Sequence, residues 1–219
     1  MKKSSILLKT RSFVQKTLKT HESGHDWWHI MRVRNTALKI AKAENADLYI
    51  VELSALLHDI ADHKFHGGDS TVGPKVARGW LESLKVEEKV VSHVVRIIEN
   101  ISFNKTLDGR ALDISIEQKV VSDADKLDCL GDVGIARAFS YGGHKNRPFY
   151  DPSIKPMKYK NSEQYRKNSA GTTINHFYEK ILLLKGTMNT KTGKSLAFKR
   201  HIFTEKFLKE FYSEWEGSL

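Results

Sequence analysis

Four side chains that could bind a metal ion are spread over the first 125 residues. They are His29 in GHDWWHI, the adjacent His58 and Asp59 in ALLHDIAD, and Asp125 in SDADKLD. Such side chains are rarely placed against apolar residues unless they are paired, bind a metal or face solvent. Imidazole nitrogen together with carboxylate oxygen suits a borderline divalent ion such as Mn²⁺, Fe²⁺, Co²⁺, Ni²⁺ or Zn²⁺. The residue types therefore predict a divalent metal site.

The segments that carry these residues have the apolar spacing of one-sided helices. Apolar residues recur every three or four positions in four segments, which run from Ile30 to Ala41, Leu53 to Ile60, Val90 to Ile98 and Phe207 to Trp215. Strand-like alternation is not evident. Helices from distant parts of the chain can direct side chains toward one ion. His58 and Asp59 are about 100° apart on a helix, so an ion that both bind must lie between their directions.

Length and composition predict one globular domain that spans residues 1–219. The hydrophobic content of 40% is enough for a substantial core. Three of the four prolines lie between residues 148 and 156, inside a polar stretch rich in Gly, Lys and Asn. We expect a loop at about residues 141–171 and a C-terminal helical pair at about 172–216. A linker between two domains would have a similar composition.

The charge and cysteine content restrict the class of protein. A net charge of +10 favours polyanionic partners such as nucleotides, nucleic acids and other phosphate esters, although Lys and Arg spread along a chain often only solvate helix faces. Cys129 is the single cysteine, so no internal disulfide forms. The first residues lack the sustained apolar run of a signal peptide or membrane span. We expect a cytoplasmic protein with no membrane partner, and the sequence does not indicate its oligomeric state.

The order His, then His-Asp, then Asp resembles the HD-domain superfamily of metal-dependent phosphohydrolases. The blocks GHDWWHIMRV, ALLHDIAD, SDADKLDCLGDVGIAR, YGG and HFYEKILLLKGTMNTKTGKSLA look like those of small bacterial HD hydrolases, some of which are nucleoside triphosphate pyrophosphohydrolases. The resemblance spans nearly the whole chain. It implies an all-α fold, an HD-domain helical bundle of roughly ten helices with the metal site in its core.

The resemblance also implies which aspartate of SDADKLD binds the metal. The family's Asp precedes Lys or Arg and an apolar residue, which matches Asp125 before Lys126. Asp123 is the second choice, because it points to a different face of the helix and would orient a neighbour or be solvated. The implied ligands of one divalent ion are His29, His58, Asp59 and Asp125. Mn²⁺ is favoured, and Mg²⁺, Fe²⁺, Co²⁺, Ni²⁺ and Zn²⁺ are alternatives.

A metal ion held in this way would activate water and polarise a phosphoryl group. Asp62 lies one helical turn after His58, and its position matches an acidic residue that takes part in catalysis in some HD phosphohydrolases. We predict that Asp62 is the general base or orients the water. The alternative is an exposed acid near a helix end.

Three basic side chains are candidates for substrate binding. Arg32 follows His29 by one helical turn and Lys126 directly follows Asp125, so both are predicted to contact phosphate oxygens near the ion. His93 is a further candidate on a helix with a Val/Ile stripe. A hydrogen-bonded core or surface histidine is the alternative for His93.

These features predict hydrolysis of a small-molecule nucleotide, with cleavage of nucleoside triphosphates to monophosphate and pyrophosphate as the first choice. A 5′-nucleotidase or phosphodiesterase activity of the same superfamily is the alternative. A non-catalytic basic module that binds nucleotide or nucleic acid is a further alternative, which the complete ligand set disfavours. HDWWH also echoes the H-E-x-x-H motif of zinc proteases, but Asp26 stands in place of the glutamate.

Overall fold

The computed structural model consists of helices joined by turns and irregular segments. It describes residues 2–18, 26–61, 69, 71–101, 114–159, 164 and 171–218. The helices are α1 (Lys3–Thr17), α2 (Trp27–Glu44), α3 (Leu48–Leu57), α4 (Val72–Ser83), α5 (Glu88–Asn100), α7 (Ile116–Leu127), α8 (Gly131–His144), α10 (Thr173–Glu179), the 3₁₀ helix η2 (Ile181–Thr187) and α11 (Lys191–Trp215). No strand occurs within the described ranges. The predicted all-α fold is confirmed.

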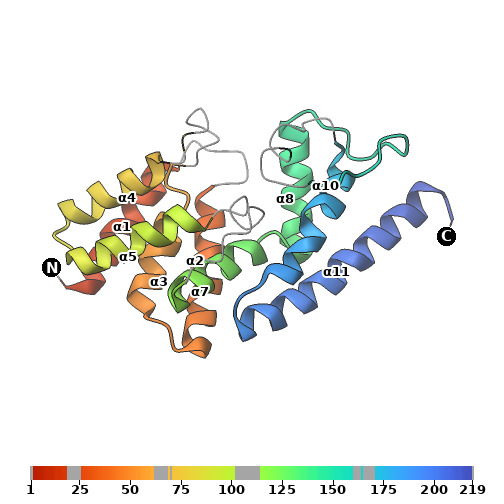
Figure 1. Cartoon of the computed structure of the whole chain (residues 1–219). Coiled ribbons are helices and arrows are strands. Elements are labelled where there is room, and N and C mark those ends of the chain that lie inside the picture. Colours follow the sequence, from red (N-terminus) through yellow and green to blue (C-terminus); the bar gives the residue numbers. More distant parts are fainter. Residues whose placement is uncertain are drawn as a thin grey trace.

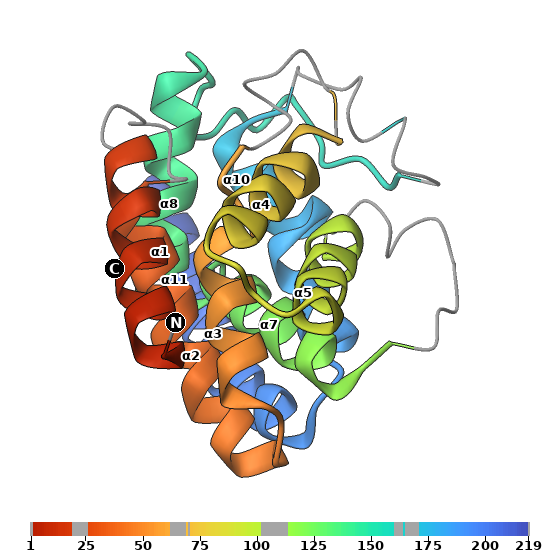
Figure 2. The same ribbon diagram turned by 90° about the vertical axis from the view of Figure 1, so that its left-hand side faces the viewer.

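Helices α2 and α7 occupy the middle of the molecule (Figure 1). Helices α1, α3, α4 and α5 lie on one side, whereas α8, α10 and α11 lie on the other, so the two ends of the chain are far apart. Helix α2 packs against both α3 and α7, and α11 packs against α7 and α8. Figure 2 shows the N-terminal group of helices from its own side, with α4 and α5 side by side.

Two hydrophobic clusters meet along α2 and α3. The first contains Ile30 and Leu53 with buried residues of α1, α4 and α5. The second contains Val33 and Val51 with buried residues of α7, α10, η2 and α11. Each of the two helices therefore buries side chains in both clusters, which fixes its rotation about its own axis. His29 directly precedes Ile30 on α2 and lies at the boundary between the two clusters.

Side-chain caps define where the central helices begin. Asp26 caps α2 by accepting the backbone N–H of His29 at 2.7 Å. Asp47 caps α3, and Ser115 caps α7. In the HDWWH sequence, Asp26 thus has a structural role as a helix cap, while His25 lies outside the described residues.

Helix α3 ends earlier than the apolar pattern predicts. The spacing from Leu53 to Ile60 predicts a helix through Ile60, but α3 ends at Leu57 and residues 58–61 form turns. The N–H of Ile60 bonds to the carbonyl of Leu57, three residues back, which is a tighter turn than an α-helix makes. His58 and Asp59 therefore follow the helix instead of lying on it.

The helix α8 extends four residues into the predicted loop at 141–171. Gly142 and Gly143 lie within the helix, and Gly142 lets α8 approach α10 closely. A Cβ atom at Gly142 would lie 2.1 Å from Oγ1 of Thr173. Residues 147–159 have no regular structure, and residues 160–163 and 165–170 lie outside the description. The predicted C-terminal helical pair corresponds to α10 and α11, which η2 separates. The single domain over 1–219 stays a prediction.

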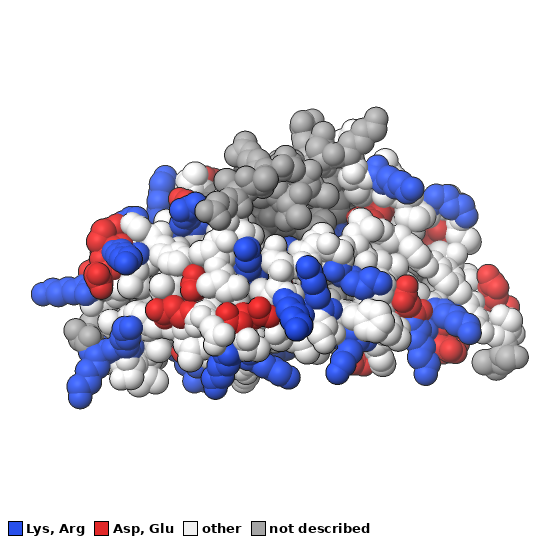
Figure 3. Space-filling view, turned by 60° about the horizontal axis from the view of Figure 1, so that its bottom comes forward, with Lys and Arg blue, Asp and Glu red and all other residues white. Residues whose placement is uncertain are grey.

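Charged side chains cover the surface seen in Figure 3 without gathering in one basic cluster. Lys and Arg are distributed along this face, and Asp and Glu lie between them. Among the described helices, none is both long and apolar enough to cross a membrane.

Replacing Gly142 by alanine should destabilise the fold through a clash with Thr173. Overpacking of this kind costs about 1–3 kcal/mol of unfolding free energy, measurable by urea denaturation. The double variant Gly142→Ala/Thr173→Ala removes the hydroxyl that would clash and should recover part of the loss. Equal stability of Gly142→Ala and the wild type would contradict the close packing of α8 on α10.

Candidate metal centre

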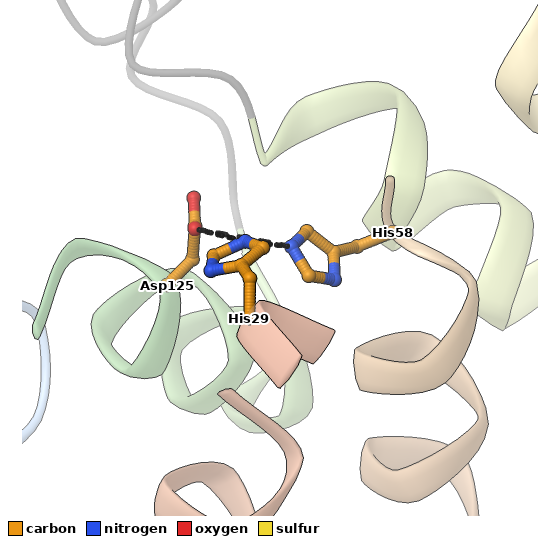
Figure 4. A group of neighbouring side chains, drawn as sticks. All are labelled: His29, His58 and Asp125. Carbon is orange, nitrogen blue, oxygen red and sulfur yellow. Dashed lines mark hydrogen bonds and ion pairs between the residues drawn. The ribbon is translucent and has the colours of Figure 1, made fainter. Parts of the chain in front are cut away.

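Four potential ligand atoms converge where α2, α7 and the end of α3 meet. The Nε2 atoms of His29 and His58 are 3.3 Å apart. Oδ2 of Asp59 lies 3.3 Å from the first nitrogen and 3.5 Å from the second. Oδ1 of Asp125 lies 3.6 and 3.8 Å from the same two atoms. Figure 4 shows how His29, His58 and Asp125 approach one another from three separate segments.

All four converging atoms are hydrogen-bond acceptors when the imidazoles are neutral. Nδ1 of His58 lies 2.9 Å from the carbonyl oxygen of Ala55, and Nδ1 of His29 lies 2.8 Å from Oδ2 of Asp128. Since a carbonyl and a carboxylate only accept, each Nδ1 carries a hydrogen and each Nε2 presents a lone pair. Four acceptors facing one another without a donor require a cation between them, either a proton or a metal ion.

The spacing of these atoms fits a divalent ion. Ligands that are each about 2.1 Å from an ion lie about 3.0 Å apart at right angles and about 4.2 Å apart on opposite sides. The separations of 3.3–3.8 Å between each imidazole nitrogen and the other ligand atoms fall between these limits. One ligand atom from each of His29, His58 and Asp125 lies within 4.8 Å of the others. Two nitrogens with two oxygens also match the borderline ions predicted from the sequence.

The centre is buried on its nitrogen side and open on its oxygen side. The imidazole side chains of His29 and His58 are 0% and 1% exposed, whereas the carboxylates of Asp59 and Asp125 are 18% and 32% exposed. A substrate therefore reaches the centre most directly past the carboxylates. The two histidines are the candidate ligands on the buried side of the centre.

The carboxylates around His29 favour its protonated form in the metal-free protein. Burial disfavours the imidazolium, but hydrogen bonds to Asp128 and Asp59 outweigh burial and raise the pKa of His29 above its ordinary value of 6.5. A metal ion that binds His29 would have to displace this proton.

The two aspartates of α7 that are candidate metal ligands lie in different surroundings. Asp125 faces the two histidines. Asp123 is fully buried and accepts four hydrogen bonds, from the backbone and side chain of Asn189 at 2.8 and 2.9 Å and from those of Thr190 at 2.7 Å each. Asp123 therefore holds the start of α11. Gly193 makes room for it, since a Cβ atom there would lie 2.2 Å from its carboxylate.

Sequence reasoning missed Asp128 and Arg137, which support the centre. Asp128 bonds to His29 as described, and Nη1 of Arg137 lies 2.9 Å from the same Asp128 oxygen. Burial opposes the ionised form of Asp128, but His29 and the two arginines that contact it hold the pKa of this carboxyl well below its usual range. The signal for Asp128 was its position three residues after Asp125, which places both on one side of α7.

The candidate phosphate ligand Arg32 lies next to the centre. Its Nε and Nη2 atoms donate to Asp128 at 2.8 and 3.0 Å, and its side chain is 35% exposed. A guanidinium has five N–H donors, so these two bonds leave others for a phosphate on the exposed side.

The other substrate candidates point elsewhere or lie outside the description. Lys126 is buried and donates to the carbonyl of Thr187 at 2.9 Å, and burial lowers the pKa of its amine despite two nearby aspartates. His93 contacts Ser115 and Glu117 at the opposite end of α7, about 15 Å along the axis from Asp125. Their roles in substrate binding stay predictions. Asp62 lies outside the described residues.

Comparison with known protein families identifies one whose model covers these residues. The HD domain model matches residues 27–130, which include His29, His58, Asp59 and Asp125. The protein YpgQ of Bacillus subtilis is 37% identical over 209 residues, which cover 94% of this chain and 92% of YpgQ.

Solved structures agree with this comparison over almost the whole chain. A Lactobacillus plantarum protein has a TM-score of 0.87 at 35% identity and covers 99% of this chain and 100% of its own. An HD-superfamily hydrolase from Bacillus thuringiensis has a TM-score of 0.76 at 41% identity, with coverages of 98% and 99%. YpgQ in complex with ADP has a TM-score of 0.75 at 33% identity, with coverages of 98% and 97%.

Alanine variants of the two α7 aspartates should separate folding from metal binding. Asp123→Ala leaves four buried donors unpaired and should lower the free energy of unfolding by about 3–5 kcal/mol, with Mn²⁺ affinity retained under folding conditions. Asp125→Ala should weaken Mn²⁺ binding by more than about tenfold and change metal-free stability by less than about 1 kcal/mol. Denaturation and calorimetric titration measure the two quantities. The reverse pattern would transfer the metal-binding role to Asp123.

Metal affinity should fall as the pH is lowered, because the ion displaces the proton that His29 binds. Below the raised pKa of His29, a single displaced proton changes the dissociation constant about tenfold per pH unit. Mn²⁺ titrations between about pH 6 and about pH 8.5 test this.

The stability of the metal-free protein should also depend on pH through His29. It should fall as the pH rises, whereas the metal affinity should rise. The raised pKa of His29 stabilises the metal-free fold fully below about pH 6.5, and this contribution is lost as the pH rises through the folded-state pKa. For the preceding prediction, a Mn²⁺ affinity that does not vary between about pH 6 and about pH 8.5 would exclude His29 as a ligand.

Proposed function

We propose that this chain, which belongs to the HD-domain family of metal-dependent phosphohydrolases, cleaves nucleoside triphosphates or their deoxy forms to the monophosphate and pyrophosphate. The observation that carries this proposal is that the Nε2 atoms of His29 and His58 lie 3.3 Å apart and each lies 3.3–3.8 Å from a carboxylate oxygen of Asp59 and of Asp125. HD domains bind divalent metals, and one ligand atom from each of His29, His58 and Asp125 lies within 4.8 Å of the others, as binding to one ion requires.

The residues present supply the parts of a phosphoryl-transfer site. His29 and His58 would hold a divalent ion from the buried side, and Asp59 and Asp125 would hold it from the open side. When bound, such an ion lowers the pKa of water and polarises phosphate oxygens. Mn²⁺ is our first choice of metal, since borderline ions suit a mixed nitrogen and oxygen set.

Arg32 is the basic residue best placed to bind the substrate. It reaches the centre through Asp128 and keeps N–H groups on its exposed side. A phosphate bound at the open, carboxylate side would be repelled by Asp59 and Asp125 unless cations offset their charge. We propose that the metal and Arg32 together offset this negative charge. Asp62 remains the proposed general base.

Support for a nucleotide comes from a relative. YpgQ, whose solved structure contains ADP, is similar to this chain over 98% of its length. The net charge of +10 also favours an anionic ligand. The choice of the bond between the α and β phosphates rests on the resemblance to pyrophosphohydrolases of the superfamily.

The test is a substrate screen of the purified full chain with Mn²⁺, Mg²⁺, Co²⁺, Ni²⁺ and Zn²⁺. We expect hydrolysis of nucleoside triphosphates to monophosphate and pyrophosphate, most rapidly with Mn²⁺ and abolished by a chelator. In ¹⁸O-labelled water, label in the monophosphate would show attack at the α phosphorus. Loss of a residue that only supports a metal ligand typically costs about 10–100-fold in activity. His58→Ala should lower the rate of hydrolysis by more than this.

His201→Gln is the matched control, because His201 is also a buried histidine but pairs with Glu205 on α11. It should retain the activity. Release of orthophosphate from monophosphates would instead support a 5′-nucleotidase, and cleavage of diesters a phosphodiesterase. If no metal permits hydrolysis of any ester but nucleic acids bind in a salt-dependent way, the chain is a non-catalytic module.

A further inference from the structure

Asp128 occupies the side of His29 that faces away from the metal centre. It is the C-cap residue of α7, and its carboxylate is 6% exposed. Its Oδ2 atom lies 2.8 Å from Nδ1 of His29, while Nε2 of the same ring faces His58 and Asp125 (Figure 4). The carboxylate and the metal centre thus contact opposite nitrogens of one imidazole.

Two arginines fix the Asp128 carboxylate in this position. Arg32, from the same helix as His29, donates to Oδ1 and Oδ2 at 2.8 and 3.0 Å. Arg137, from α8, lies 2.9 Å from Oδ2 and also donates to the backbone carbonyl of Asp128 at 3.2 Å. Residues of α2, α7 and α8 therefore meet at one buried carboxylate.

This arrangement permits only one tautomer of neutral His29. Each arginine can only donate, so the Asp128 oxygens accept on every side, and the hydrogen of His29 must be on Nδ1. The lone pair is then on Nε2, where the centre requires it. An amide at this position could donate to Nδ1 and stabilise the opposite tautomer, which removes the lone pair from the metal side.

We propose that Asp128 is a positioning residue of the metal centre, which sets the tautomer and orientation of His29, and that Arg137 anchors Asp128 from α8. Partners of this kind typically contribute about 10–100-fold to metal affinity. The inference rests on the metal site of the proposed function but not on its substrate. Arg137 acts here through Asp128, although the charges of Asp59 and Asp125 also favour its guanidinium.

The test compares Asp128→Asn with Asp132→Asn. Both remove one carboxylate, but Asp132 lies exposed in the first turn of α8. Asp128→Asn should weaken binding of Mn²⁺ and Zn²⁺ about 10–100-fold in competition with a chelator, and Asp132→Asn should leave it unchanged. Equal affinities of Asp128→Asn and the wild type would overturn the proposal.

A second measurement reports the tautomer itself and needs neither metal nor substrate. In ¹⁵N-labelled metal-free protein, at a pH where the nitrogen shifts themselves show a neutral imidazole, long-range proton–nitrogen spectra should show the hydrogen of His29 on Nδ1. Asp128→Asn should shift the population toward Nε2, an effect that simple destabilisation would not produce. An unchanged tautomer would overturn the proposal even if affinity fell.

A third variant keeps the test valid if Asp128→Asn does not fold. Asp128→Asn/Arg137→Met removes one buried guanidinium with the carboxylate, so the charge is balanced. It should show the same loss of affinity and the same tautomer shift, and wild-type values for both would overturn the proposal.

If the wild type binds metal but hydrolyses no nucleotide, only the proposed function fails. If it hydrolyses nucleotides and Asp128→Asn binds metal normally, only the present inference fails.

Discussion

The structure depends on holding four hydrogen-bond acceptors together at distances where they repel one another. The two imidazole nitrogens lie 3.3 Å apart, and each lies 3.3–3.8 Å from both carboxylate oxygens. Both imidazole side chains are buried. In the metal-free protein the raised pKa of His29 favours a proton that offsets part of this repulsion, and the surrounding helices hold the atoms in place. The unfavourable contact and the function are therefore the same feature of the molecule.

The helices meet this demand because each is fixed at more than one point. Helix α2 is capped by Asp26 and buries side chains in both hydrophobic clusters, which fixes the direction of His29. The tight turn after α3 directs His58 inward, with its Nδ1 hydrogen on the carbonyl of Ala55. Helix α7 is tied to the C-terminal region through Asp123. The metal centre thus depends on contacts from both sides of the molecule.

Sequence patterns predicted the helices and the convergence of the histidines with Asp125 well, because apolar periodicity and residue type are local properties. They did not predict contacts made across the fold. Lys126 neighbours Asp125 in sequence but is directed at Thr187. Asp128 carried no prediction, because its contact with Arg137 of α8 is made across the fold. Residues 141–144 were predicted to belong to a loop, although they continue α8, where Gly142 makes the close contact with α10.

Three aspartates within six residues at the C-terminal end of α7 have three different roles. Asp123 holds the start of α11, Asp125 faces the metal centre, and Asp128 holds the imidazole from behind. Their separation depends only on helical rotation, about 100° per residue. This segment should therefore tolerate insertions and deletions less than any loop of the protein, since one added residue would exchange the surroundings of all the acids that follow it.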